Sequence, residues 1–141
     1  MANDLWLRGD EARRRVMGEA YVAETRSRAS SEEDVEFDDF VTQLGWGATW
    51  ARAELDVRTR SAITVMALVA NGNELELEGH IAGALRNGLT RREIAEIVRH
   101  AAIYCGIPAA KAGMRALGRT RRLQEEDGLD FTGSHLIQRD E

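Results

Sequence analysis

The strongest chemical candidate in the sequence is His80, because Glu76 lies four residues before it. Residues four apart on a helix project from one face, so the carboxylate and the imidazole would lie side by side. A neighbouring carboxylate favours the imidazolium, which predicts a raised pKa for His80 and a proton donor near neutral pH. Surface Glu–His pairs with this spacing are also common, and that alternative stays open. The apolar residues Leu77, Ile81 and Ala84 place His80 at the edge of an apolar stripe.

Two arginines, Arg58 and Arg60, fall in the first turn of a predicted helix. The helix macrodipole disfavours cations there. A carboxylate ligand would explain them, because the helix N-terminus and a guanidinium fork can hold it together. The alternative is that they pair with acids such as Glu54 or Asp56, or with another subunit.

Two tryptophans, Trp46 and Trp50, occur beside Gly45 and Gly47. Glycine permits close backbone approach, so this cluster is typical of a pocket wall, although packing of the indole rings in a core is the default. The segment therefore forms either one wall of a binding site or part of the hydrophobic core.

A second pair with helical spacing, His100 and Tyr104, stands just before the break Gly106-Ile107-Pro108. Either residue could face a cleft, or lie in the core or in an interface. Cys105 has apolar neighbours and no charged partner in the sequence, which favours inert burial over nucleophilic catalysis.

The elements that must position these residues are helices. Apolar residues recur at spacings of three and four, there is a single proline, and β-branched alternation is almost absent. We predict six helices, over roughly Gly9–Ser27, Val35–Trp50, 57–71, Glu74–Asn87, 91–105 and 108–124. Gly45 and Gly47 make the end of the second irregular, Gly88 ends the fourth, and Thr90 with Glu93 forms a capping box before the fifth. The fold class is all-α.

The composition of the chain excludes several classes of function. The 141 residues carry a formal charge of −5, with 43% apolar and 30% charged residues, which is typical of one globular domain. An acidic chain is a poor candidate for binding nucleic acid or membrane surfaces. One cysteine excludes a disulfide framework, and no metal-ligand spacing occurs. Without an apolar export segment near the N-terminus, we expect a cytoplasmic protein.

The domain is expected to span residues 1–124, followed by an acidic tail over 125–141 that is mobile or docks on a neighbouring subunit. The predicted third and fifth helices are apolar around more than half of their circumference. Such helices are usually buried, and a chain of this size has few layers to cover them. We therefore expect a homo-oligomer.

Four blocks of sequence occur in a characteristic order: Phe40–Gly47 (FVTQLGWG), Leu55–Ser61 (LDVRTRS), His80–Thr90 (HIAGALRNGLT) and Ala102–Ala110 (AIYCGIPAA). These blocks resemble the carboxymuconolactone decarboxylase family, and the similarity runs from about Arg8 to Arg122. The related alkylhydroperoxidase D-like enzymes use Cys-x-x-Cys-x-x-x-His and a relay glutamate. Their cysteines would fall at Asn73 and Glu76 and the glutamate at Ser61, so dithiol peroxidase chemistry cannot operate here.

The resemblance implies an alkylhydroperoxidase D-like helical fold in ring-shaped homo-oligomers, typically hexamers. It also implies cofactor-free decarboxylation of 4-carboxymuconolactone to 4-oxoadipate enol-lactone and CO2, in protocatechuate breakdown. The expected roles follow: Arg60, with Arg58, binds a substrate carboxylate, and His80, tuned by Glu76, donates a proton or a hydrogen bond. The remaining expected pocket residues, which would exclude water, are Trp46, Trp50, His100 and Tyr104.

Several positions depart from the family pattern: Ala53, Glu54, Leu75, Gly79 and Lys111. They leave the expected fold intact and bear on the substrate. Two alternatives are therefore kept. One is an enzyme of the same fold recruited to another small carboxylated or lactone substrate, as a decarboxylase, isomerase or cyclase. The other is a non-catalytic oligomeric binding module.

Overall fold

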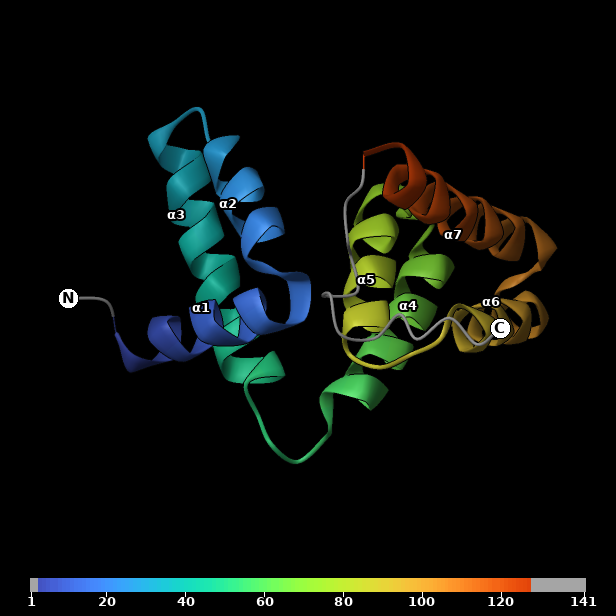
Figure 1. Cartoon of the computed structure of the whole chain (residues 1–141). Coiled ribbons are helices and arrows are strands. Elements are labelled where there is room, and N and C mark those ends of the chain that lie inside the picture. The colour runs from blue at the N-terminus through green and yellow to red at the C-terminus, as the bar shows by residue number, and fades with distance from the viewer. Residues whose placement is uncertain (1–2, 128–141) are drawn as a thin grey trace. The chain divides into compact units, whose positions relative to one another are not determined.

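The computed structural model describes residues 3–127, with side chains through residue 121, and this part is helical without strands (Figure 1). The prediction of an all-α chain is confirmed. The helices are α1 (Asp4–Met17), α2 (Glu19–Ser27), α3 (Glu32–Val41), η1 (Thr42–Trp50), α4 (Val57–Asn71), α5 (Glu74–Arg86), α6 (Arg91–Cys105) and α7 (Ile107–Asp127). The chain divides into two compact units, Met1–Val57 and Arg58–Glu141. None of the described helices is both long and apolar enough to cross a membrane.

The first unit contains a helix break that the sequence analysis missed. We predicted one helix over Gly9–Ser27, but the chain breaks at Gly18, which has φ of 90° and separates α1 from α2. Only glycine adopts this conformation without strain. The helix also starts earlier than predicted, because the Asn3 side chain caps α1 by accepting a hydrogen bond from the Trp6 N–H at 2.7 Å.

The irregular end predicted for the second helix is a nine-residue π-helix, η1, which continues directly from α3. Two glycines let α1 pack against it at backbone distance. A Cβ on Gly9 would lie 2.1 Å from the Thr42 carbonyl oxygen, and a Cβ on Gly47 would lie 2.1 Å from that of Leu5. Because no side chain fits between these backbones, the crossing of α1 and η1 depends on both glycines.

Charged residues hold the helices of the first unit together. The buried Arg13 donates to Asp38 at 2.7 Å, and Arg26 forms ion pairs with Asp10 at 2.6 Å and Asp38 at 3.2 Å. Hydrogen bonds from Arg14 and Arg26 outweigh the cost of burial and lower the pKa of Asp10. The network joins α1, α2 and α3, and removing one partner would leave a desolvated charge.

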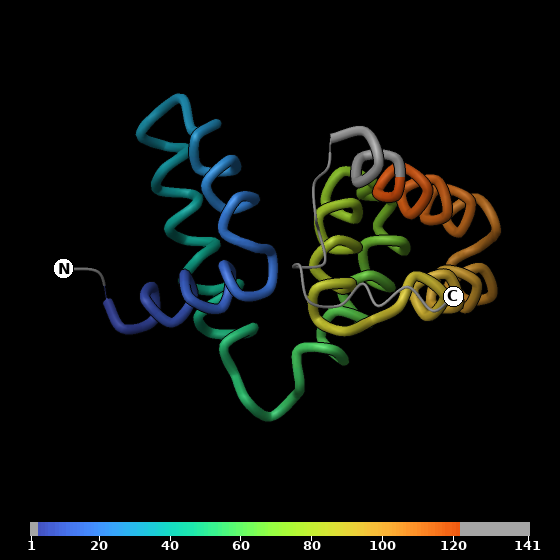
Figure 2. Tube along the Cα trace, viewed as in Figure 1, coloured from blue at the N-terminus to red at the C-terminus, as the bar shows by residue number. Residues whose placement is uncertain are grey.

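The second unit follows the sequence signals more closely. Asn73 caps α5, and the predicted capping box of Thr90 and Glu93 opens α6. Gly88 and Gly106 take φ of 97° and 94° at the turns after α5 and α6. Figure 2 shows α6 and α7 as neighbouring stretches of the trace joined by a short connection, and α7 extends to Asp127. The core contains Val65, Val69, Leu77, Ile81, Ala84, Leu85, Leu89, Ile94, Val98, Ala101, Ala110, Ala116 and Leu117.

Candidate functional site

His80 is a half-buried residue in the middle of α5. Its neighbours Leu77 and Ile81 are 1% and 0% exposed, so the helix holds the imidazole against the apolar core of the second unit. Burial lowers the pKa of His80 to about 4 from its ordinary 6.5. The raised pKa predicted from Glu76 is therefore wrong, because removal of water from the ring outweighs an exposed carboxylate one turn away. The chain presents a neutral imidazole at neutral pH.

The first turns of α4 lie beside the end of α5. The Asn87 amide, after α5, donates a hydrogen bond of 2.9 Å to the hydroxyl of Ser61, which is 2% exposed. Since Gly72 and Asn73 join the other ends of these helices, α4 and α5 run antiparallel. Ser61 and Asn87 thus bring a hydroxyl and an amide together at this end of the helix pair, and the half-buried Arg60 precedes Ser61 in the chain.

Ser61 and Asn87 were not assigned roles from the sequence. Both lie in the family-like blocks, but nothing in their spacing indicates that they meet, because 26 residues separate them. His80 lies seven residues before Asn87 on α5, about 10 Å along the helix axis. Ser61 and Asn87 therefore lie at one end of the α4–α5 pair, and His80 lies about two helical turns away along α5.

Arg58 contacts a more distant acid than those considered from the sequence. Its guanidinium pairs with Glu93, the glutamate of the capping box that opens α6. The hydrogen bonds from the Thr90 backbone and from Arg58 lower the pKa of Glu93. Arg58 thus ties the start of α4 to the start of α6, and it must exchange this carboxylate for that of a substrate to bind one.

The two tryptophans belong to the first unit. Trp46 is 6% exposed and packs in the core with Val16, Met17 and Val22, while Trp50 is half-buried. Their rings stack with centroids 5.2 Å apart. Core packing therefore accounts for Trp46, and Trp50 presents the more accessible indole.

The other aromatic pair lies on the surface of α6. The rings of His100 and Tyr104 have centroids 5.0 Å apart, and Tyr104 is 73% exposed beside Ile103, which is 79% exposed. In the single chain they face solvent. A role in a closed pocket would require cover from another copy. Cys105 is half-buried.

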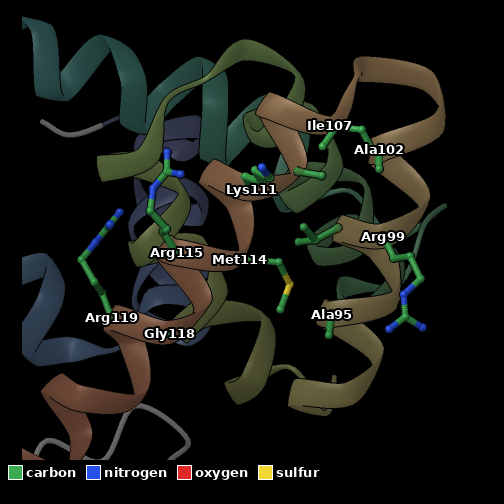
Figure 3. Close-up of a pocket in the computed structure, with 11 residues that line it drawn as sticks. Ala95, Arg99, Ala102, Ile107, Lys111, Met114, Arg115, Gly118 and Arg119 are labelled. Atoms are coloured by element: carbon green, nitrogen blue, oxygen red, sulfur yellow. The ribbon is translucent and has the colours of Figure 1, made fainter.

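A hollow of the second unit lies elsewhere, between α6 and α7. It is an open groove of about 810 Å³ lined by residues such as Ala95, Val98, Ala102 and Met114 (Figure 3). None of the eight predicted site residues lines it. If this groove were the active site, His80, Arg58 and Arg60 would all lie outside it. Among the side chains described, residues 3–121, no group of three or more His, Cys, Asp and Glu could hold a metal.

The chain is similar to a known family and to proteins of known activity. A model described as the carboxymuconolactone decarboxylase family matches residues 36–118, a range that includes all eight predicted site residues. The chain is 35% identical to 4-carboxymuconolactone decarboxylase of Acinetobacter baylyi over 109 residues, covering 77% of this chain and 81% of that protein. It is 36% identical to nitrosuccinic acid decarboxylase of Metarhizium robertsii over 110 residues, covering 78% and 76% respectively.

Proposed function

Because the chain belongs to the carboxymuconolactone decarboxylase family, we propose that it converts 4-carboxymuconolactone to 4-oxoadipate enol-lactone and CO2. The observation that carries this proposal is 35% identity along 81% of an enzyme named for that activity. Both named relatives are decarboxylases, which supports carboxy-lyase activity as the general class.

The substrate itself explains why the reaction needs no cofactor. Loss of CO2 from the γ-carbon of the butenolide leaves an electron pair that enters the ring as a dienolate, with the negative charge on the lactone oxygen. A proton then adds to the α-carbon. The protein must hold a dianionic substrate, stabilise the developing oxyanion and exclude water. These tasks require cations and hydrogen-bond donors.

The neutral state of His80 supports one of its two expected roles over the other. A ring with a pKa of about 4 carries no transferable imidazolium proton at neutral pH. Its N–H can still donate a hydrogen bond to the dienolate oxygen, and a preorganised neutral imidazole needs no reorganisation as the charge develops. We assign His80 this hydrogen-bonding role rather than that of a general acid.

The carboxylate end of the substrate is assigned to Arg60. Its guanidinium supplies paired donors for a carboxylate, and Arg60 directly precedes Ser61, whose hydroxyl accepts a hydrogen bond from the Asn87 amide. Arg58, held by Glu93, is the second cation. Glu76 remains a candidate for tuning His80. Water exclusion by the four aromatic and imidazole residues predicted from the sequence stays a prediction: Trp46, Trp50, His100 and Tyr104.

A homo-oligomer, a hexamer or a trimer, is also proposed. Large apolar side chains are exposed on α3 and η1 of the single chain, where Phe37, Phe40 and Leu44 are 67%, 55% and 48% exposed. The rings of Phe37 and Phe40 stack with centroids 6.1 Å apart. Contiguous exposed apolar surface of this kind typically marks an interaction site. Assembly into a ring and location in the cytoplasm stay predictions.

A second candidate substrate is favoured by the relative that acts on nitrosuccinic acid, to which identity is similar at 36%. In that acid a nitro group, in place of a lactone, can accept the electron pair left by CO2. The demands on the protein are otherwise the same: a cation for a carboxylate and a donor for the developing oxyanion. Three positions that depart from the family pattern bear on the choice between the two substrates: Leu75, Gly79 and Lys111.

The test is a direct assay with both substrates. Protocatechuate dioxygenase and the cycloisomerase would generate 4-carboxymuconolactone in place, and nitrosuccinate would be supplied directly, with CO2 release followed in each case. Saturable turnover of the lactone, and at most slow turnover of nitrosuccinate, is expected. Turnover of nitrosuccinate alone would replace the proposed substrate, and turnover of neither by a folded protein would contradict both.

Variants of His80 test its role in the same assay. His80→Ala removes the donor and is expected to lower kcat about a hundredfold or more. His80→Gln keeps an N–H donor and is expected to stay within about tenfold of wild type. Equal losses in the two variants would indicate proton transfer by the imidazole instead. His135→Gln, the same substitution in the C-terminal segment, is the matched control.

A further inference from the structure

The groove between α6 and α7 has an apolar floor that the described residues leave open. Ala95 and Ala102 of α6 face Ile107 and Met114 of α7 across it, and Ile107 and Met114 remain 56% and 48% exposed. Figure 3 shows the Met114 side chain directed from α7 towards α6, near Ala95. An exposed apolar strip between two long helices is a surface on which another segment can pack.

Basic side chains form the rim of this floor. Arg99 lies on the α6 side, and Lys111, Arg115 and Arg119 lie on the α7 side (Figure 3). A second stretch shares Ala95, Arg99, Met114 and Gly118 with the first and adds Arg91, Arg92 and Arg121, so the groove is continuous.

Acids only partly neutralise this rim. Glu96 lies 2.5 Å from Arg99, Arg115 pairs with Glu74 at 3.2 Å, and Arg119 pairs with both Glu74 and Glu78. Seven basic side chains along the groove therefore face three acids. The groove is apolar along its floor and positive along its edges.

The chain holds a segment of complementary character. Residues 128–141 (GLDFTGSHLIQRDE), which follow α7, contain three acidic residues and one basic residue. This segment therefore carries a net charge of −2. Its large apolar residues form two short groups: Leu129 and Phe131, which flank Asp130, and the neighbours Leu136 and Ile137. An acidic strip with apolar side chains matches the charge and the floor of the groove.

The length of the segment is sufficient for it to reach the groove of its own chain. From Asp127 back to Ile107 along α7 is about 30 Å at 1.5 Å per residue. The 14 residues after Asp127 can span up to about 46 Å when extended. Gly128 follows the last residue of α7, and glycine at that position is the usual residue for ending a helix and reversing the chain.

We propose that residues 128–141 fold back and dock in the α6–α7 groove of the same chain, with their apolar side chains on the floor and their acids towards the basic rim. The short tether favours this intrachain contact, because it gives the segment an effective concentration in the millimolar range. The docked segment covers an apolar surface that the helices leave open. It also lies away from the helix pair that carries His80 and Arg60.

Disulfide exchange in the full-length chain tests this placement. In a Cys105→Ser background, Gly118→Cys and Ser134→Cys would place one thiol in the groove and one in the segment. A Cβ at Gly118 meets no atom within 4 Å, so this thiol fits without displacing a neighbour. The control pair combines Ser134→Cys with Ala112→Cys, which lies on α7 but does not line the groove. Equilibration in glutathione buffers measures the effective concentration of each pair.

The docked segment predicts an effective concentration for the groove pair at least about tenfold above that of the control pair. The difference in loop length alone accounts for less than about twofold. Lys111→Glu is expected to reduce the advantage several-fold, and Arg15→Glu, on α1, is expected to leave it unchanged. Equal values for the two pairs would overturn the proposal. Disulfide-linked dimers in place of intrachain bonds would overturn it in favour of docking on a second copy.

Discussion

The neutral state of His80 predicts how the stability of the protein depends on pH. In the folded chain burial lowers the pKa of His80 to about 4, whereas the unfolded chain has the ordinary value of 6.5. Between these values the unfolded state binds the proton and the folded state does not. Stability therefore rises with pH through this window, and it is lost as the pH falls from 6.5 towards 4.

The size of the effect follows from the two pKa values. At pH 7.5 the ring is neutral in both states and contributes almost nothing. At pH 5 the unfolded chain is almost fully protonated at this residue, and the folded chain is not. The free energy of unfolding then falls by about 2 kcal/mol on going from pH 7.5 to pH 5 because of this one group.

The assay compares wild type with His80→Gln by urea unfolding at both pH values, at one fixed protein concentration, so that the proposed assembly would contribute equally throughout. His80→Gln changes the absolute stability, but it removes the titrating ring, so only the difference between the two pH values is compared. Carboxyls with lowered pKa values, such as those of Asp10 and Glu74, are common to both proteins and cancel. We expect wild type to lose about 2 kcal/mol more than the variant. An equal loss, or a smaller one in wild type, would refute the burial argument and restore the pairing with Glu76.

Three further predictions concern the helix crossing and the site. Gly47→Ala would place a Cβ 2.1 Å from a backbone oxygen and is expected to lower the free energy of unfolding by more than about 2 kcal/mol. Gly45→Ala, whose nearest neighbour would be a side-chain atom at 3.8 Å, is the control and is expected to be neutral or stabilising in urea unfolding. Arg60→Gln is expected to raise KM about tenfold or more with little change in kcat, whereas Arg15→Gln changes neither, and an unchanged KM would remove Arg60 from substrate binding. The kcat/KM of wild type is expected to show no inflection from His80 between pH 6 and 8, and an inflection lost in His80→Gln would contradict the neutral ring.

The parts of the fold that local signals encode could be predicted from the sequence. The glycine after α5 marks the end of that helix, and the capping box at Thr90 marks the start of α6. Both could be predicted because caps depend on residues a few positions apart. Ser31 caps α3 by accepting a hydrogen bond from the Asp34 N–H. Glycines also signalled that the chain from Gly45 onward is not a regular helix.

The features that depend on distant residues could not be predicted in the same way. The break at Gly18 lies within an apolar stripe that is typical of one continuous helix. The break is needed only because α1 and α2 pack as two separate helices. The pKa of His80 depends on how completely the core covers the ring, so a nearby carboxylate gave the wrong sign. Arg58 finds its acid 35 residues away, and the basic groove combines the faces of two helices.

Under the proposed function, the activities of the two named relatives and the neutral state of His80 together predict what the site recognises. A lactone and a nitro group share no shape, but each delocalises the electron pair released with CO2 onto an oxygen. A neutral N–H donor serves either oxygen equally well, whereas an imidazolium would also attract the departing carboxylate and stabilise the ground state. Burial of His80 thus favours stabilisation of the transition state over tight binding of the substrate. On this argument substrate choice lies with the residues around the carboxylate end, Arg60, Ser61 and Asn87, and with the positions that depart from the family pattern.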